Sequence, residues 1–105
     1  MDGRELINRV ADVLRQRFGD VIGPVILFGS RASARALPDS DFDILVVLNS
    51  RFDWRVENAI LDACFELDLE YDILSDVKVI SREDLDTWKG KQPFILKAFS
   101  EGISA

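Results

Sequence analysis

The sequence predicts an α/β (α+β) fold in one domain, and three observations carry this prediction. Segments with the periodicity of amphipathic helices alternate with short apolar segments rich in β-branched residues, as is typical of helices packed on a sheet. The chain has 105 residues, enough for one hydrophobic core and too few for a separate substrate-binding domain, so residues 1–105 are expected to form one unit. The hydrophobic content of 48% and the charged content of 30% are those of a soluble globular protein.

The first element is predicted to be an amphipathic helix that begins after Asp2 and ends near Gly19. Asp2 and Glu5 have the spacing of a capping-box variant, in which a side-chain oxygen accepts a hydrogen bond from a free backbone N–H. The apolar residues of this segment fall on one face at helical spacing: Leu6, Ile7, Val10, Val13, Leu14 and Phe18. We expect this helix to be scaffold, because it carries no candidate chemistry.

Two apolar segments, residues 24–28 and 41–48, are predicted to be buried strands. The residues between them open with a Gly-Ser pair, continue with good helix formers and end in turn chemistry. The second strand is unusual because its first residues are acidic.

Asp41 and Asp43 stand at positions i and i+2 of this second strand. Side chains at this spacing point to the same face, where two carboxylates repel each other unless a cation lies between them. Mg²⁺ is a hard ion that takes such oxygen ligands and keeps positions open for water and phosphate. Gly29 has no Cβ, so the backbone at Gly29-Ser30 can approach a phosphate closely. Together these features indicate metal-assisted nucleotidyl or phosphoryl transfer.

Each half of this pattern also has an ordinary explanation. Asp-x-Asp alone fits a solvated acidic turn that leads into a strand, and Gly-Ser alone fits loop punctuation. The specific signal is the order of the parts: strand, Gly-Ser, short helical segment, turn, Ser-Asp-x-Asp and apolar strand.

The next helix is predicted to begin at the capping residue Asp53 and to run to about Leu69. Phe52 and Trp54, at its start, belong either to the core or to a partner surface, and we favour the core. Residues 71–80 are predicted to form a third strand, because they are apolar at first and alternate at their end. The inward positions of the helix are expected to be Val56, Ile60, Leu61, Cys64, Phe65 and Leu67.

The end of the chain is predicted to contain two more helices. Ser81 caps a short one, and Pro93 suits the first turn of a last helix that Gly102 closes. Large apolar residues in this region either complete the core or form a dimer or partner interface, and we favour the core for all of them: Trp88, Phe94, Phe99 and Ile103.

Composition excludes several classes of function. A net charge of −6 and a pI near 4.5 argue against binding to the backbone of long nucleic acids. The chain has no histidine, which excludes Ser-His-Asp and His-metal chemistry. Its one cysteine, Cys64, is expected to be an inert core thiol. No apolar run approaches the roughly 20 residues that span a bilayer, and no signal-peptide pattern is found, so we expect a cytoplasmic protein without membrane association.

Gly29-Ser30, followed by Ser40-Asp41-Phe42-Asp43 and an apolar strand, resembles the signature of the polymerase-β-type nucleotidyltransferase superfamily. The small size is similar to that of its minimal nucleotidyltransferase (MNT) branch, single-domain proteins often paired with a helical HEPN toxin. The resemblance covers nearly the whole chain and implies a small mixed sheet with helices packed mainly on one side.

The resemblance also implies roles for individual residues. Asp41 and Asp43 would bind Mg²⁺, with two ions expected, and a third carboxylate would come from a later strand. Asp72 is the candidate because it precedes an Ile-Leu pair, although Glu70 and Asp76 have the same strand parity and spacing does not separate the three. The nucleotide-binding residues implied are Gly29, Ser30, Arg31 and Ser40.

The activity implied is transfer of a nucleoside monophosphate, expected to be AMP from ATP although another NTP is possible, to an acceptor hydroxyl. A tyrosine of a HEPN toxin partner is one such acceptor, which gives the chain an antitoxin role; a homodimer is a further expectation. The alternative is an antitoxin that acts by contact only, with a degenerate site. Ser33 and Ala34 motivate it, because they stand where the family usually has Arg-Gly.

Overall fold

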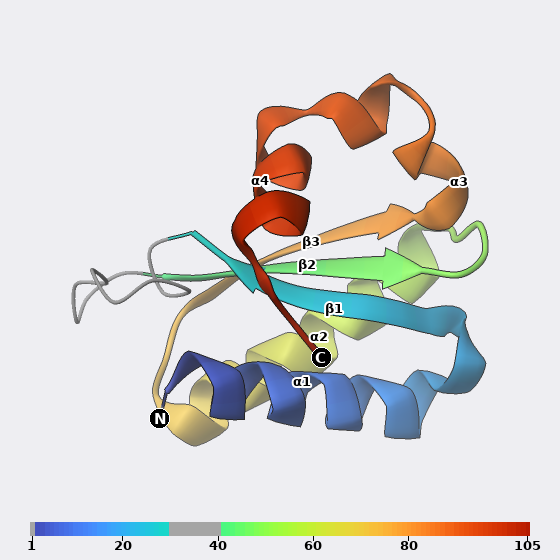
Figure 1. Ribbon diagram of the computed structural model, residues 1–105. Helices are drawn as coiled ribbons and strands as arrows, with labels where there is room; N and C mark the ends of the chain where they lie inside the picture. Colours follow the sequence, from blue (N-terminus) through green and yellow to red (C-terminus); the bar gives the residue numbers. More distant parts are fainter. Residues whose placement is uncertain (1, 30–40) are drawn as a thin grey trace.

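The computed structural model describes residues 2–29 and 41–105, and in this part of the chain it has a four-stranded mixed sheet in the order β3-β2-β1-β4 (Figure 1). β1 runs antiparallel to β2 and to β4, whereas β2 and β3 are parallel. The predicted α/β fold with a small mixed sheet is confirmed. The strands are β1 (Ile22–Phe28), β2 (Phe42–Leu48), β3 (Ser75–Ser81) and β4 (Ile103–Ser104).

Three of the α-helices in the described residues begin where the sequence places capping side chains, and the last begins at Pro93. Asp2 Oδ1 accepts a hydrogen bond from Glu5 N at 2.8 Å, and Asp53 Oδ1 accepts from the first backbone N–H groups of the helix that follows it. Ser81 Oγ accepts from Asp84 N at 3.2 Å. The predicted helix starts are therefore confirmed. The helices are α1 (Gly3–Phe18), η1 (Gly19–Val21), α2 (Trp54–Tyr71), α3 (Arg82–Leu85), η3 (Trp88–Lys91) and α4 (Pro93–Glu101).

The two faces of the sheet pack against different helices. The long helices α1 and α2 lie on one face, and α4 with the short α3 and η3 lies on the other (Figure 1). Because side chains alternate along a strand, Ile44 and Val46 of β2 join the core under α1 and α2, while Leu45 and Val47 join the smaller core under α4. No helix in residues 2–29 and 41–105 is long and apolar enough to cross a membrane.

The region between α2 and β3 differs from the prediction. The helix continues to Tyr71 and ends at Asp72, which has a left-handed φ of 53°, so β3 begins at Ser75 rather than at residue 71. Asp68 stabilises this end, because its carboxylate accepts hydrogen bonds from Ser75 N at 3.1 Å and from Ser75 Oγ at 2.8 Å. The assignment of residues 71–74 to a strand was wrong.

Several large apolar side chains lie outside the core. The expectation that Trp54, Phe65, Trp88 and Phe99 are buried was wrong, since each is at least half exposed and Trp88 reaches 72%. Phe52 does pack against the core under α1 and α2. The other two predicted residues at the chain end, Phe94 and Ile103, are partly buried. Cys64, on α2, is buried as expected.

β4 is a short strand that the sequence pattern did not indicate. Ile103 and Ser104 pair with β1, directly after α4 ends at Gly102. A Cβ at Gly102 would overlap Ile26 and the Ala98 carbonyl oxygen, so only glycine allows the chain to pass this close to β1.

Candidate active site

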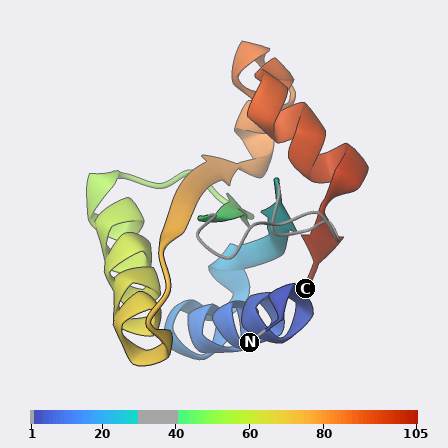
Figure 2. The ribbon, with the colours of Figure 1, turned by 90° about the vertical axis from the view of Figure 1, so that its left-hand side faces the viewer.

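The candidate site lies at the end of the sheet where β1 ends and β2 and β3 begin, the end that faces the viewer in Figure 2. Asp43 is at its centre, on β2. Its register partner on β1 is Phe28, and its register partner on β3 is Asp76. Asp43 alternates with Ile44, so its side chain lies on the α4 face of the sheet.

Asp76 places a second carboxylate beside Asp43. Residues in register on neighbouring parallel strands point to the same face, and adjacent strands lie about 4.8 Å apart. Asp41 comes two residues before Asp43, is exposed, and directly precedes β2. The structure therefore brings Asp41, Asp43 and Asp76 to one end of the α4 face.

The electrostatics of Asp43 reflect this crowding. Its pKa is raised above the ordinary value of 3.8, first because burial disfavours the charged form and then because the Asp76 and Asp41 carboxylates repel it. The ammonium groups of Lys78 and Lys97 lower the pKa in part. A divalent cation between these carboxylates would relieve the repulsion.

The donor set fits a hard cation with an open coordination sphere. Within residues 2–29 and 41–105 no three carboxylate, thiol or imidazole groups converge closely enough to enclose a metal ion by themselves. A Mg²⁺ ion held by Asp43 and Asp76, with Asp41 near, would draw its other ligands from water and phosphate, which is how Mg²⁺ is bound in many phosphoryl-transfer sites.

Gly29 leaves room for this carboxylate pair. Its φ is 76°, in the left-handed region that favours glycine, and a Cβ on it would overlap the Asp43 carboxylate. Glycine is thus favoured here for two independent reasons, the backbone conformation and the space for Asp43.

Asp72 does not share the position of Asp76. It caps the C-terminus of α2, where its backbone N–H donates to the Asp68 carbonyl oxygen, and it precedes β3 rather than belonging to it. Glu70 lies within α2, so the predicted common strand parity of residues 70, 72 and 76 was wrong. The alternation of residues 76–80 is the signal that marks the true strand. Ser30, Arg31 and Ser40, the other predicted nucleotide-binding residues, lie outside the described residues.

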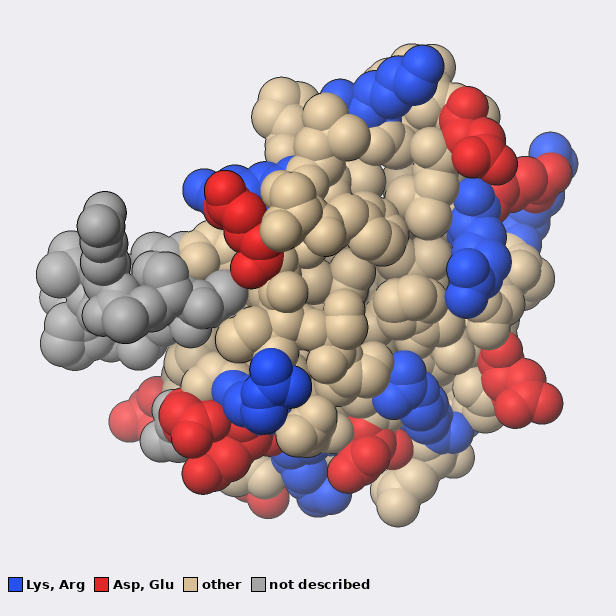
Figure 3. Space-filling view, in the orientation of Figure 1, with Lys and Arg blue, Asp and Glu red and all other residues tan. Residues whose placement is uncertain are grey.

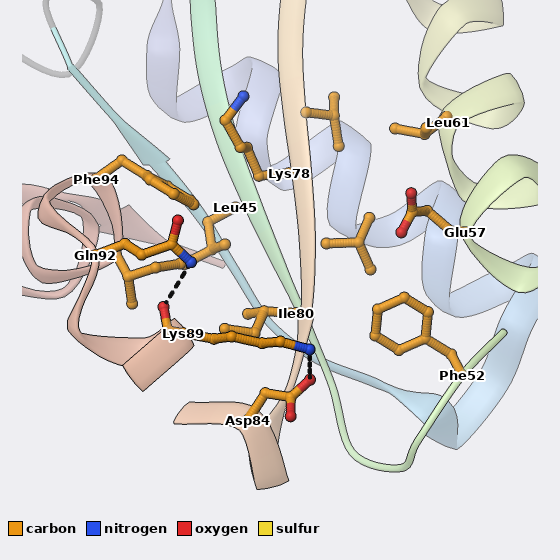
Figure 4. A pocket seen from close by; sticks show the side chains of 13 residues that line it. Leu45, Phe52, Glu57, Leu61, Lys78, Ile80, Asp84, Lys89, Gln92 and Phe94 are labelled. Carbon is orange, nitrogen blue, oxygen red and sulfur yellow. Dashed lines mark hydrogen bonds and ion pairs between the residues drawn. The ribbon is translucent and has the colours of Figure 1, made fainter. Parts of the chain in front are cut away.

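A cleft of about 310 Å³ lies at the outer edge of β3, between α2 and the α3–α4 region (Figure 4). Phe52 and Glu57 line it from the α2 side, and Lys89 and Phe94 from the other. Lys78 of β3 also lines it, so the cleft adjoins the carboxylates through this side chain. Acidic and basic side chains are interspersed on the face shown in Figure 3, without a continuous basic surface for nucleic acid.

The chain matches the family model described as a nucleotidyltransferase domain over residues 7–101. This match includes both strands that carry Asp43 and Asp76. The chain belongs to the nucleotidyltransferase domain family. The predicted family membership is thereby confirmed, and with it the assignment of the chain to the nucleotidyltransferase enzymes.

One relative of this nucleotidyltransferase is named "Putative protein adenylyltransferase MJ0604" of Methanocaldococcus jannaschii. The two are 28% identical over 102 residues, which cover 97% of this chain and 96% of the relative.

Two similar solved structures share the nucleotidyltransferase fold. One is a mutant of the toxin–antitoxin MntA-HpeT, with a TM-score of 0.62 and 18% identity, and it covers 92% of this chain and 69% of the other. The second is described as the toxin–antitoxin with AMP-PNP, with a TM-score of 0.62, 21% identity and the same two coverages.

Proposed function

We propose that this nucleotidyltransferase transfers AMP from ATP to an acceptor hydroxyl in a Mg²⁺-dependent reaction. The observation that carries the proposal is the pairing of Asp43 with Asp76 on the α4 face, beside a glycine whose missing Cβ leaves space for Asp43. Two carboxylates kept side by side at a cost in electrostatic energy favour a cation-binding role over a structural one.

Asp41, Asp43 and Asp76 are the residues proposed to hold Mg²⁺, with two ions expected as in the family. When bound, Mg²⁺ supplies charge neutralisation at the phosphates and aligns them for in-line attack. Asp76 takes the part expected of Asp72, that of the third carboxylate, which would complete the metal site or act as the base for the attacking hydroxyl. Gly29 is proposed to admit the phosphates, together with Ser30, Arg31 and Ser40 as the family resemblance implies.

The acceptor is proposed to be a protein side chain. A relative of nearly the same length is named a protein adenylyltransferase, and two structures of this fold come from a toxin–antitoxin, one of them with the ATP analogue AMP-PNP. A tyrosine of a helical HEPN toxin is the specific acceptor that we propose, with homodimerisation as a second kind of assembly. Since the reaction draws on ATP, the cytoplasm remains the expected location.

A second function, neutralisation of the toxin by contact alone, is favoured by one observation. Ser33 and Ala34 replace the Arg-Gly of the family motif, which removes an expected phosphate contact. The two functions differ in whether Asp43→Asn abolishes neutralisation while partner binding persists.

Calorimetric titration of ATP, with and without Mg²⁺, tests the proposal. Wild type is expected to bind only with the metal, and both Asp43→Asn and Asp76→Asn should lose this binding. Asp72→Asn is the matched control, because it removes an equal charge at the end of α2 and should bind as wild type does. Failure of the wild type to bind ATP, GTP, CTP or UTP would contradict the enzyme and favour the contact-only protein.

A further inference from the structure

Lys78 lies on β3 two residues beyond Asp76, on the same face of the strand. Its Nζ donates to both oxygens of the Asp76 carboxylate, at 3.1 and 3.4 Å. The same ammonium group is 5.7 Å from the centroid of the Phe94 ring, on α4. Lys78 therefore occupies the space between the carboxylate pair and the cleft at the edge of β3.

This ion pair contributes little to the stability of the fold. The side chains of Lys78 and Asp76 are 43% and 53% exposed, and pairs this exposed are typically worth less than about 1 kcal/mol. The ammonium group also lowers the pKa of Asp43, so its field reaches both members of the carboxylate pair. Lys78 is thus placed to act electrostatically on both carboxylates of the pair.

We infer that Lys78 is the resident counter-ion of the Asp43–Asp76 pair and exchanges this place for the phosphates of the incoming nucleotide. With no metal bound, the ammonium group offsets the repulsion between the two carboxylates. The same oxygens would hold a divalent cation, whose larger charge would replace that of the ammonium group and free Lys78 from Asp76. The flexible four-carbon stem of lysine then lets Nζ turn from Asp76 to a phosphate oxygen, with the Phe94 ring beside its path.

This inference rests on the proposed function. It predicts that one substitution changes the affinities for free Mn²⁺ and for Mg²⁺-ATP in opposite directions. Lys78→Met removes a cation that competes for the carboxylates, so free Mn²⁺ should bind more tightly, by roughly 2- to 5-fold. The same substitution removes a charged donor to phosphate, so Mg²⁺-ATP should bind more weakly, by roughly 10-fold or more. A residue with a merely structural role would not move the two affinities in opposite directions.

The experiment measures free Mn²⁺ binding by electron paramagnetic resonance and Mg²⁺-ATP binding by calorimetry on the same proteins. Lys78→Arg should restore most of the ATP affinity, because it returns a cation of similar reach. Lys89→Met is the matched control, since Lys89 lines the same cleft but pairs with Asp84, at 3.7 Å, and should leave both affinities unchanged.

Two results would overturn the inference. One is Mn²⁺ affinity that is unchanged or reduced in Lys78→Met, and the other is ATP affinity that does not fall. Wild type that binds Mg²⁺-ATP in an Asp43-dependent manner, combined with either result, rejects the role of Lys78 while the proposed function stands. Wild type that binds neither ligand rejects both.

Discussion

The two faces of strand β2 show how one segment of seven residues serves two purposes. On the face under α1 and α2, every residue from Phe42 onward is apolar and buried. On the face under α4, Leu45 and Val47 are also buried, but Asp43 precedes them in the same row. The first face is core along its whole length, whereas the second changes from core to charged site between Asp43 and Leu45. Core residues and the candidate site residue Asp43 are therefore neighbours on the same strand, and substitutions can test them separately.

The largest expected effect concerns the purely apolar face. Ile44 is 1% exposed, so Ile44→Ala should lower the free energy of unfolding by about 2–5 kcal/mol, through lost apolar contact and the cavity that remains. Urea denaturation measures this loss. Leu45→Ala, on the other face, should cost a similar amount, and a loss near zero there would show that the core under α4 does not hold the sheet.

Gly29 is expected to give the next largest effect, and Gly19 offers a matched control. Both have positive φ, and Gly19 has a ψ of −139°, so alanine should be strained at either position, at a cost of about 1–3 kcal/mol. A Cβ at Gly19 meets no atom within 4 Å, whereas a Cβ at Gly29 overlaps the Asp43 carboxylate. Gly29→Ala should therefore destabilise more than Gly19→Ala and should alone abolish Mg²⁺-ATP binding. Equal thermal shifts with binding intact in both variants would contradict this account of Gly29.

Asp43→Asn is expected to stabilise the fold slightly at neutral pH while it removes metal binding. Burial and like charges raise the pKa of Asp43, so the folded state holds this proton more tightly than the unfolded chain does. Stability is thus lost as the pH rises from about the ordinary value of 3.8 through the folded pKa, and the loss is complete once the pH exceeds the folded pKa. Relief of a cross-strand like-charge pair is worth roughly 0.5 kcal/mol, or about 2–4 °C in Tm.

Thermal denaturation of wild type and Asp43→Asn between pH 3 and pH 8 checks this sign. The advantage of the variant should shrink toward zero at the acidic end, where Asp43 is protonated in both states. An advantage that is constant with pH would assign the effect to packing instead of charge.

The smallest expected effect comes from the exposed aromatic residues. Trp88 is 72% exposed, so Trp88→Ser should change the free energy of unfolding by less than about 0.5 kcal/mol. Chemical denaturation followed by circular dichroism measures it. A loss above about 2 kcal/mol would contradict the exposed position of Trp88 and support its predicted place in the core.

Local chemistry explains which parts of the fold could be predicted. Asp2, Asp53 and Ser81 act on backbone N–H groups within three residues, so the sequence nearby is sufficient to locate the helix starts. Gly29 and Asp43 were proposed as site residues for the same reason, since a short motif contains both the turn and the acidic strand.

The misassigned parts depend on contacts that no short motif contains. The end of α2 is decided by Asp72 in a left-handed conformation and by Asp68 bonded to Ser75, and no breaker in the sequence marks it. The pairing of Asp43 with Asp76 is a property of strand register, which the sequence does not state. The prediction that Phe65 and Trp88 are buried was wrong for a related reason. Helical spacing shows which residues share a face of a helix, but it does not show whether another element covers that face.

The parallel pairing of β2 with β3 has a consequence for folding. Asp43 and Asp76 belong to segments separated by the whole of α2, so no early hairpin contains both of them. The chain must complete a long-range crossover before a ligand can be held across the two strands, and such contacts of large sequence separation form slowly. A nucleotide and its metal, once bound there, would stabilise only the finished crossover, by about 2.7 kcal/mol at a ligand concentration 100-fold above Kd. Occupancy of this site is thus coupled to this long-range step of assembly, and in the loaded protein the bound ligand should oppose the separation of β3 from β2.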